Sequence, residues 1–184
     1  MNGQGVRVDC QITCLQPIAV GIAEAPRASF ARRLKLLIRR HLSPRRERAF
    51  KSATNNLMNW AARLRGRDVK PLAAPPVAGG PSLKAGDLVR VRSREQIEAT
   101  LNHWRQLKGC TFMPEMAQYC GTTQRVLRAM ERFVDERDLQ VKRCRGIVLL
   151  EGVICQGTAD FGRCDRSCHL FWREEWLERL SADR

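Results

Sequence analysis

Residues 147–154, with the sequence IVLLEGVI, predict the central strand of a small β-sheet. Gly152 interrupts this apolar run, which indicates a bulge or a sharp bend in the strand. On its N-terminal side, residues 126–134 and 139–142 alternate apolar and basic side chains, a pattern typical of strands. The charged residues 135–138 separate these two segments and predict the turn between them.

Further outward, a Gly-Asp turn at residues 86–87 precedes another alternating segment, so a strand is expected there as well. Ser93 and Gln96 match the capping box of a short helix. Several short strands after such an entry turn favour a strongly bent sheet. The expected fold is therefore α+β: a small, strongly bent β-sheet or SH3-like barrel with a short inserted helix and a C-terminal capping helix.

The capping helix is expected over about residues 168–180. Trp172, Trp176 and Leu180 recur at intervals of four residues, so they would share one helix face and pack on the core. Arg173 would point toward solvent. Stacking of the tryptophans on a base or another ligand is the alternative interpretation of this segment.

Residues 29–66 predict a basic amphipathic helical arm that precedes the sheet domain. Its two helices are expected to meet at Ser43 and Pro44, which suit an N-cap and a first helical turn. The apolar face of the first helix comprises Phe30, Leu34, Leu37 and Ile38. The apolar face of the second, which should end near residue 64, comprises Phe50, Ala53, Leu57, Ala61 and Leu64.

The chain is expected to have four segments. Residues 1–28 are weakly patterned and predict a poorly ordered N-terminus, which the arm at 29–66 follows. Residues 71–81 are uncharged and rich in Pro, Gly and Ala, so they predict a linker. Residues 82–184 then form the small α+β domain.

Most of the positive charge lies in the arm. The chain carries a net charge of +14; fifteen basic and four acidic residues lie before position 71, a net charge of +11, and residues 84–184 carry only +3. This asymmetry favours an anionic partner for the arm, namely nucleic acid, an acidic membrane surface or an acidic protein, whereas a solvated helix face is the alternative. The residues expected to contact that partner are Arg32, Arg33, Lys35, Arg39, Arg40, Arg45, Arg46 and Arg48.

Three of the eight cysteines, Cys155, Cys164 and Cys168, fall within fourteen residues near the C-terminus. Thiols at this density point to a soft metal ion, a disulfide or redox chemistry. The N-terminus has no secretory signal pattern, and no apolar run reaches the ~20 residues that a transmembrane helix needs. We therefore expect a cytoplasmic protein, with peripheral attachment at the membrane as the alternative. Clustered cysteines in a reducing compartment are interpreted first as metal ligands.

Cys120 is the preferred fourth ligand, because it ends a helix just before a strand that could neighbour the strand ending at Cys155. Four thiolates would close a tetrahedral structural zinc site. Cys144 is expected at the far end of the strand from Cys155, whereas Cys110 is harder to exclude. His169 is a further candidate ligand, but its position next to Cys168 makes simultaneous binding by both awkward. An iron–sulfur cluster (Fe–S), a catalytic zinc ion with one position for water, and buried or redox thiols are the alternative interpretations.

Several segments of the second domain form a distinctive set, at 83–87, 112–116, 119–121, 150–153, 171–174 and 176–177. Together with Cys155 and the Cys164 and Cys168 pair, they resemble a family of small uncharacterised bacterial proteins over residues 83–180. The resemblance implies a bacterial, cytoplasmic protein and favours Cys120, Cys155, Cys164 and Cys168 as the ligand set. It implies no activity.

The favoured function is a non-catalytic, metal-stabilised binding or adaptor module whose cationic arm binds an anionic partner or a partner protein. The alternative is an enzyme or biosynthetic accessory that uses the cysteine cluster to hold an Fe–S centre or a catalytic zinc ion. The sequence contains no phosphate loop, no Gly-x-Gly-x-x-Gly and no His-Glu-x-x-His motif. The three histidines are scattered, and none predicts a catalytic triad.

Overall fold

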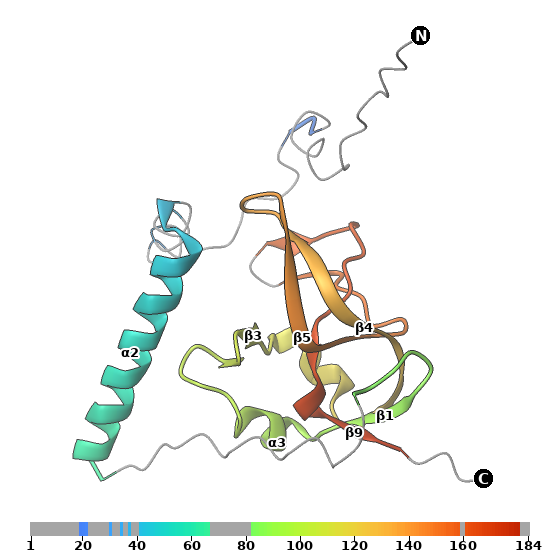
Figure 1. The fold of residues 1–184 in the computed structure, drawn as a ribbon, viewed down its shortest axis with the longest axis horizontal. Coiled ribbons are helices and arrows are strands. Elements are labelled where there is room, and N and C mark those ends of the chain that lie inside the picture. The colour runs from blue at the N-terminus through green and yellow to red at the C-terminus, as the bar shows by residue number, and fades with distance from the viewer. Residues whose placement is uncertain are drawn as a thin grey trace.

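The computed structural model describes residues 19–21, 30, 34, 37, 41–66, 82–158 and 161–180 of the 184-residue chain. They form a mixed α and β structure whose largest element is a five-stranded antiparallel sheet (Figure 1). In chain order the elements are α2 (Pro44–Leu64), β1 (Leu88–Val91), α3 (Arg94–Glu98), β2 (Gln106–Leu107), β3 (Cys110–Thr111), η2 (Pro114–Tyr119), β4 (Thr123–Asp135), β5 (Gln140–Leu150), β6 (Gly157–Thr158), β7 (Gly162–Arg163), β8 (Trp172–Arg173), η3 (Glu174–Trp176) and β9 (Leu177–Arg179). The predicted mixture of helix and strand is confirmed.

Helix α2 begins and ends where the sequence predicts. Ser43 is the N-cap, and its side chain accepts a hydrogen bond from the backbone N–H of Arg46, while Pro44 occupies the first turn. Gly66 follows the helix with a φ of 67°, a left-handed conformation that glycine adopts without strain. Local chemistry at both ends therefore explains the extent of this helix.

Parts of the predicted N-terminal organisation lie outside the described residues. This holds for the predicted linker at 71–81 and for all of residues 1–28 except 19–21. The described positions of the first predicted helix are Phe30, Leu34, Leu37 and His41, and all four are helical and exposed.

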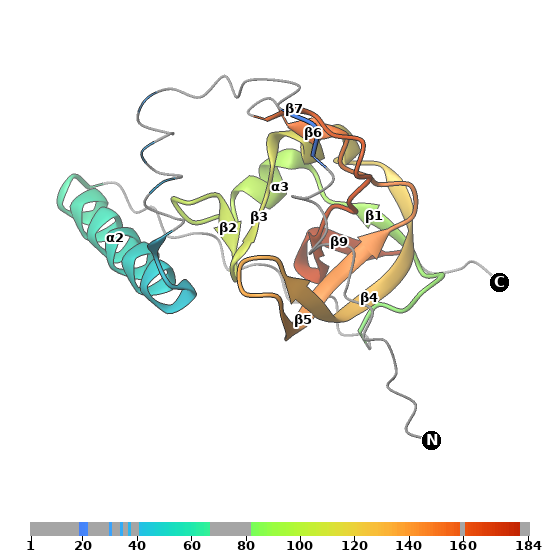
Figure 2. The ribbon, with the colours of Figure 1, turned by 90° about the horizontal axis from the view of Figure 1, so that it is seen from above.

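The five strands of the sheet run in the order β8-β5-β4-β1-β9, and each neighbouring pair is antiparallel. Strands β4 and β5 form a long hairpin around the predicted turn. Strands β8 and β9 lie at opposite edges, yet only the three residues of η3 connect them in the chain. The sheet therefore curls strongly (Figure 2), but within the described ranges no strand pairing joins its two edges, so it is not closed.

The predicted central strand corresponds to the end of β5. The strand finishes at Leu150, and Glu151 and Gly152 then form a turn in which Gly152 has a φ of 68°. The bend expected from this glycine is therefore present. The predicted capping box of Ser93 and Gln96 is also present, at the start of α3.

The prediction of a C-terminal helix over residues 168–180 is wrong. The segment instead contains β8, η3 and β9. Trp172 of β8 pairs with β5, and Leu177 of β9 pairs with β1. Strands β5 and β1 therefore supply partners for backbone groups that a helix would have paired within the segment itself.

Both tryptophans of this segment lie in the apolar core that the curled sheet surrounds. Trp176 packs edge-on against Phe112 with a centroid distance of 5.7 Å, and Trp172 packs against Tyr119 at 6.2 Å. The indole Nε1 of Trp176 donates to Oγ1 of Thr100 at 3.1 Å. The prediction that Trp172 and Trp176 are core residues is confirmed, since both are fully buried. The other buried apolar residues are Leu83, Val89, Val91, Ile97, Met116, Val126, Val148, Leu150, Val153, Leu170 and Leu177.

Arg173 does not point toward solvent as predicted; it is buried in an ion cluster. Its Nε and Nη2 donate to the carboxylate of Glu175 at 2.9 and 2.7 Å, and its Nη1 donates to the backbone carbonyl of Arg145 at 3.0 Å. Nζ of Lys108 also donates to Glu175, at 2.7 Å. The cluster joins the chain around η3 to the middle of β5 and to the turn between β2 and β3.

Candidate functional site

Three of the four proposed metal ligands lie at the base of the β6–β7 hairpin. The backbone N–H of Cys155 donates to the carbonyl of Cys168 at 2.7 Å, and the N–H of Cys164 donates to the carbonyl of Gln156 at 3.2 Å. A bridge between Ile154 and the residue after Cys168 continues this pairing. We call this unit, residues 154–158 and 161–169, the cysteine hairpin.

The two arms of the cysteine hairpin approach each other at Gly157. This residue has a φ of 110°, and a Cβ atom built on it would lie 2.1 Å from the carbonyl oxygen of Gly162. Only glycine fits such a position without a shift of the backbone. The sequence of the hairpin therefore explains how the flanking cysteines come together.

The thiols of the cysteine hairpin are free but do not form a closed ligand set. Cys164 and Cys168 are exposed and Cys155 is half-buried, and none of the three is in a disulfide. Across the described ranges, no group of three or more His, Cys, Asp or Glu side chains is arranged to hold a metal ion. The structure thus brings the three backbones together without converging their Sγ atoms on one point.

Cys120, the proposed fourth ligand, lies at the end of η2 and packs against the core. Burial raises the pKa of its thiol, and the charged neighbours that also act on it are Arg94, Glu95 and Glu98 at α3. A raised pKa keeps the sulfur protonated at neutral pH, so metal binding would have to displace this proton.

Cys110 and Cys144 have structural surroundings. The Sγ of Cys110 donates to the carbonyl of Phe171 at 3.5 Å, and burial raises the pKa of this thiol to about 11. The Sγ of Cys144 donates to the carbonyl of Met130 at 3.2 Å, and burial raises its pKa as well. Both are neutral thiols with main-chain partners.

His169, the last residue of the cysteine hairpin, contributes an unpartnered nitrogen. Its Nδ1 is buried and has no hydrogen-bond partner among the described residues. His169 follows Cys168 directly and pairs with Ile154 across the base of the hairpin. Buried polar atoms are nearly always satisfied, so this imidazole is a further candidate donor for a soft metal ion.

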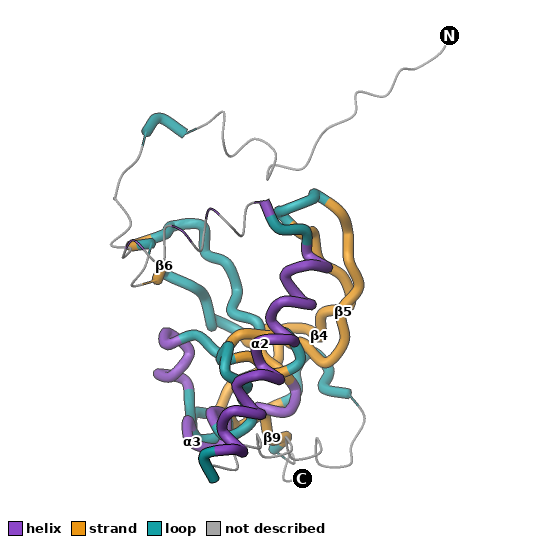
Figure 3. The backbone as a smooth tube through the Cα atoms, turned by 90° about the vertical axis from the view of Figure 1, so that its left-hand side faces the viewer, coloured by secondary structure: helices purple, strands orange, loops and turns teal. Residues whose placement is uncertain are grey.

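A second candidate site is helix α2, which lies along one side of the β-domain (Figures 1 and 3). The loop before β2 forms hydrogen bonds with the middle of α2. There the backbone N–H of His103 donates to Oδ1 of Asn55 at 3.4 Å, and the ring Nε2 of His103 lies 2.9 Å from Oδ1 of Asn59. Nε1 of Trp104 donates to the carbonyl of Lys51 at 3.2 Å.

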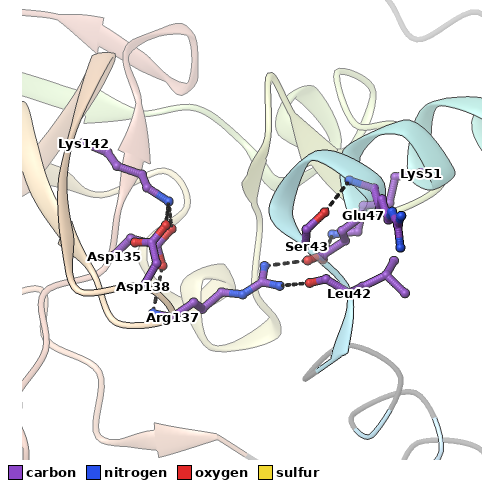
Figure 4. A network of polar contacts seen from close by, with 9 residues as sticks. Leu42, Ser43, Glu47, Lys51, Asp135, Arg137, Asp138 and Lys142 are labelled. Carbon is purple, nitrogen blue, oxygen red and sulfur yellow. Dashed lines mark hydrogen bonds and ion pairs between the residues drawn. The ribbon is translucent and has the colours of Figure 1, made fainter.

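The β4–β5 turn forms hydrogen bonds and an ion pair with the start of α2 (Figure 4). The guanidinium of Arg137 donates to Oε2 of Glu47 at 2.6 Å and to the carbonyl of Leu42 at 2.9 Å. Glu47 also forms an ion pair with Lys51, one helical turn onward, at 2.9 Å. Hydrogen bonds and an ion pair therefore hold α2 against the domain at its start and at its middle.

The apolar face of α2 is exposed to solvent. The exposed fraction is 57% for Phe50, 62% for Leu57, 58% for Trp60 and 68% for Leu64. Among the described residues, the ring contact between this face and the domain is that of Phe50 with Trp104, 6.4 Å apart between centroids. The helical spacing predicted this face apart from Trp60, which lies one turn before Leu64 and which the same spacing could have identified.

Basic residues accompany the apolar face. Arg45, Arg46 and Arg48, three of the eight residues predicted to bind an anionic partner, lie in the first turns of α2 and are exposed. Arg63 in the last turn is exposed as well. The remaining five predicted residues, Arg32, Arg33, Lys35, Arg39 and Arg40, lie outside the described residues.

No family model, curated protein or solved structure matches the chain. The resemblance of residues 83–180 to small bacterial proteins stays a prediction. Among the helices that the structure describes, none combines the length and the apolarity that crossing a bilayer requires. Function is therefore argued from the cysteine hairpin and from the apolar face of α2.

Proposed function

We propose that this protein is a non-catalytic binding or adaptor module that its basic arm attaches to an anionic membrane surface. The observation that carries this proposal is the apolar face of α2, exposed on a helix that also exposes arginines. A helix of this composition lies at the lipid headgroup boundary, with its apolar side inward and its basic side chains toward acidic lipids.

Both kinds of side chain contribute to the attachment. Burying a large apolar side chain is worth about 1.5–3 kcal/mol relative to leaving it exposed. Each arginine near an acidic leaflet adds about 1 kcal/mol. The four apolar residues of the face are 57–68% exposed, so with Arg45 and Arg46 they supply roughly 6 kcal/mol before the cost of immobilising the protein is subtracted.

The apolar face distinguishes a membrane surface from the other anionic partners. Nucleic-acid binding needs basic side chains for the phosphates and can use aromatic rings such as Phe50 and Trp60 to stack on bases, but the exposed Leu57 and Leu64 have no role in it. An acidic protein could cover the apolar face, but it would have to be complementary in shape as well. Nucleic acid and an acidic protein are therefore the alternative outcomes of the test.

Vesicle sedimentation with the full chain tests the attachment. Vesicles that contain phosphatidylserine should sediment the protein, and pure phosphatidylcholine vesicles should not. Leu57→Glu should weaken binding about tenfold or more, because it places a carboxylate on the apolar face. Leu127→Glu is the matched control, since it puts the same charge on a partly exposed leucine of β4.

Equal sedimentation of the two variants would contradict the proposal. A nucleic-acid gel shift that Leu57→Glu leaves unchanged, without vesicle binding, would assign the arm to nucleic acid instead. Absence of binding to both probes would favour an acidic protein partner.

We also propose that the cysteine hairpin binds a structural metal ion, with zinc as the first choice and an Fe–S cluster as the alternative. Three free thiols and one unpartnered imidazole nitrogen are suitable donors for a soft metal. Cys155, Cys164 and Cys168 would bind it together with Cys120, and their Sγ atoms would have to converge from the described positions. A redox Fe–S centre or a catalytic zinc ion would instead make the protein an enzyme or a biosynthetic accessory.

We further propose that the curled sheet is a variant of an SH3-like barrel. In such a barrel, β8 and β9 would lie close together at the two ends of η3. The three-residue length of η3 supports this assignment, because both edge strands begin or end next to it.

A further inference from the structure

A cavity of about 710 Å³ opens at the middle of the β4–β5 hairpin, apart from the cysteine hairpin and from α2. The register of the two strands shifts at this point. Met130 pairs with Ile147 and Arg132 pairs with Arg143, so one residue of β4 faces three residues of β5. The additional residues form a bulge, and the cavity lies against it.

The buried ion cluster holds the bulge in shape. Gly146 lies in the bulge with a φ of 65°, and a Cβ atom there would lie 2.9 Å from Nη2 of Arg173. Nη1 of Arg173 donates to the carbonyl of Arg145, and Glu175 fixes the same guanidinium from the other side. One wall of the cavity is therefore preorganised.

Three arginines line the cavity, and two of them face each other. Arg132 and Arg143 occupy directly opposed positions of the hairpin, and Arg145 lies two residues further along β5. Like charges in opposed positions destabilise an antiparallel pair. Within the described part of the chain, the guanidinium groups of these three residues make no hydrogen bond or ion pair.

The carboxylates around the cavity do not neutralise this charge. Glu131 and Glu174 also line it. Oε1 of Glu174 accepts hydrogen bonds from Oγ of Ser82 at 2.7 Å and from the N–H of Leu83 at 3.2 Å. Glu174 is therefore directed to the start of the domain, and the lining, with three arginines against two glutamates, keeps an excess of positive charge.

We propose that this cavity binds a phosphate monoester whose dianion lies between Arg132 and Arg143. Planar guanidinium groups bind phosphate oxygens in pairs, and a dianion between them would remove their mutual repulsion. A volume of about 710 Å³ also accommodates the organic part of a small ligand. The phosphate belongs either to a soluble small molecule or to a lipid headgroup.

Binding of two probes to the full chain tests this site. Glycerol 3-phosphate represents the soluble source, and vesicles with phosphatidic acid represent the lipid source. Arg143→Gln should weaken binding of the true ligand class about tenfold or more, because it removes one charge-assisted contact. Arg128→Gln is the matched control, since Arg128 is exposed on β4, pairs with Leu149 and does not line the cavity.

The melting temperature separates a binding role from a structural one. Without ligand, Arg143→Gln should melt at the same temperature as the wild type or higher, because the opposed charges are gone. Phosphatidylserine vesicles should still bind this variant through α2, so the outcome does not depend on the membrane proposal. Binding of glycerol 3-phosphate that Arg143→Gln weakens would assign the soluble source. Weaker binding of Arg143→Gln to phosphatidic-acid vesicles alone, with phosphatidylserine binding unchanged, would assign the lipid.

Three results would overturn the site. They are no binding of either probe, an equal loss in Arg128→Gln and Arg143→Gln, and a lower melting temperature of unliganded Arg143→Gln.

Discussion

Glu175→Gln should destabilise the protein at neutral pH, and this effect should disappear in acid. The carboxylate of Glu175 is almost fully buried and accepts hydrogen bonds from Arg173 and Lys108. Burial by itself would raise the pKa of Glu175, but these hydrogen bonds outweigh it and lower the pKa to about 2. The carboxylate is thus the counter-charge of a buried guanidinium.

The magnitude follows from the pKa. A decrease from the ordinary value of 4.5 to about 2 corresponds to about 3 kcal/mol of stabilisation by the ionised carboxylate. For a lowered pKa, this contribution is complete above the unfolded value near 4.5. It is lost as the pH falls through the folded value near 2. Glutamine cannot ionise and leaves Arg173 uncompensated, so the variant should lose about 3 kcal/mol at pH 7.

Urea unfolding followed by tryptophan fluorescence measures this difference. Two of the four tryptophans, Trp172 and Trp176, are buried and flank Arg173 and Glu175 in the chain, so their emission reports on unfolding of this region. The free energies of unfolding of wild type and variant should differ most above pH 5 and should converge as the pH falls toward 3. Glu178→Gln is the matched control. Glu178 pairs with Arg92 but is 43% exposed, so its loss should cost less than about 1 kcal/mol at any pH.

Two results would refute the reasoning. One is a loss below about 1 kcal/mol for Glu175→Gln at pH 7, which would mean that the buried pair contributes no more than a surface pair. The other is a difference that stays constant between pH 7 and pH 3, which would show that ionisation of Glu175 is not the source.

The remaining predictions concern the core and the cysteines. Trp172→Ala should lower the free energy of unfolding by about 3–5 kcal/mol, because it removes a fully buried aromatic side chain; unchanged stability in urea would contradict the core assignment. Cys164→Ser should lower both the zinc content and the melting temperature, since metal binding and folding are coupled. Elemental analysis of the purified variant checks this, and full metal content with unchanged melting would speak against the site.

The clustering of Cys155, Cys164 and Cys168 could be predicted from their spacing, and the hairpin brings their backbones together as expected of neighbours in the chain. The unpartnered Nδ1 of His169 could not be predicted in the same way, because its burial depends on segments far away in the sequence. Whether Cys120 joins them depends on packing between separate elements, and spacing along the chain carries no information about that.

Features decided within a few residues could be predicted from the sequence. The N-cap at Ser43, the capping box at Ser93 and the bend at Gly152 depend on local hydrogen bonds or on backbone freedom, and each is present in the structure. The burial of Trp172 and Trp176 was also predicted correctly, although the helical face on which that prediction rested is absent. At the two caps and at the Gly152 bend, the groups concerned are neighbours in the chain, so the pattern contains the physical cause, whereas the two tryptophans pack on distant residues.

Features decided by distant partners could not be predicted. The last segment forms two edge strands rather than a helix because β1 and β5, far away in the sequence, offer it free backbone groups. Arg173 is buried because the bulge of β5 accepts a hydrogen bond from its guanidinium and because Lys108 shares its partner carboxylate. The sequence by itself determined that α2 is an amphipathic basic helix. Only the contacts of Trp104 and Arg137 with its polar side decided that its apolar face is exposed to solvent.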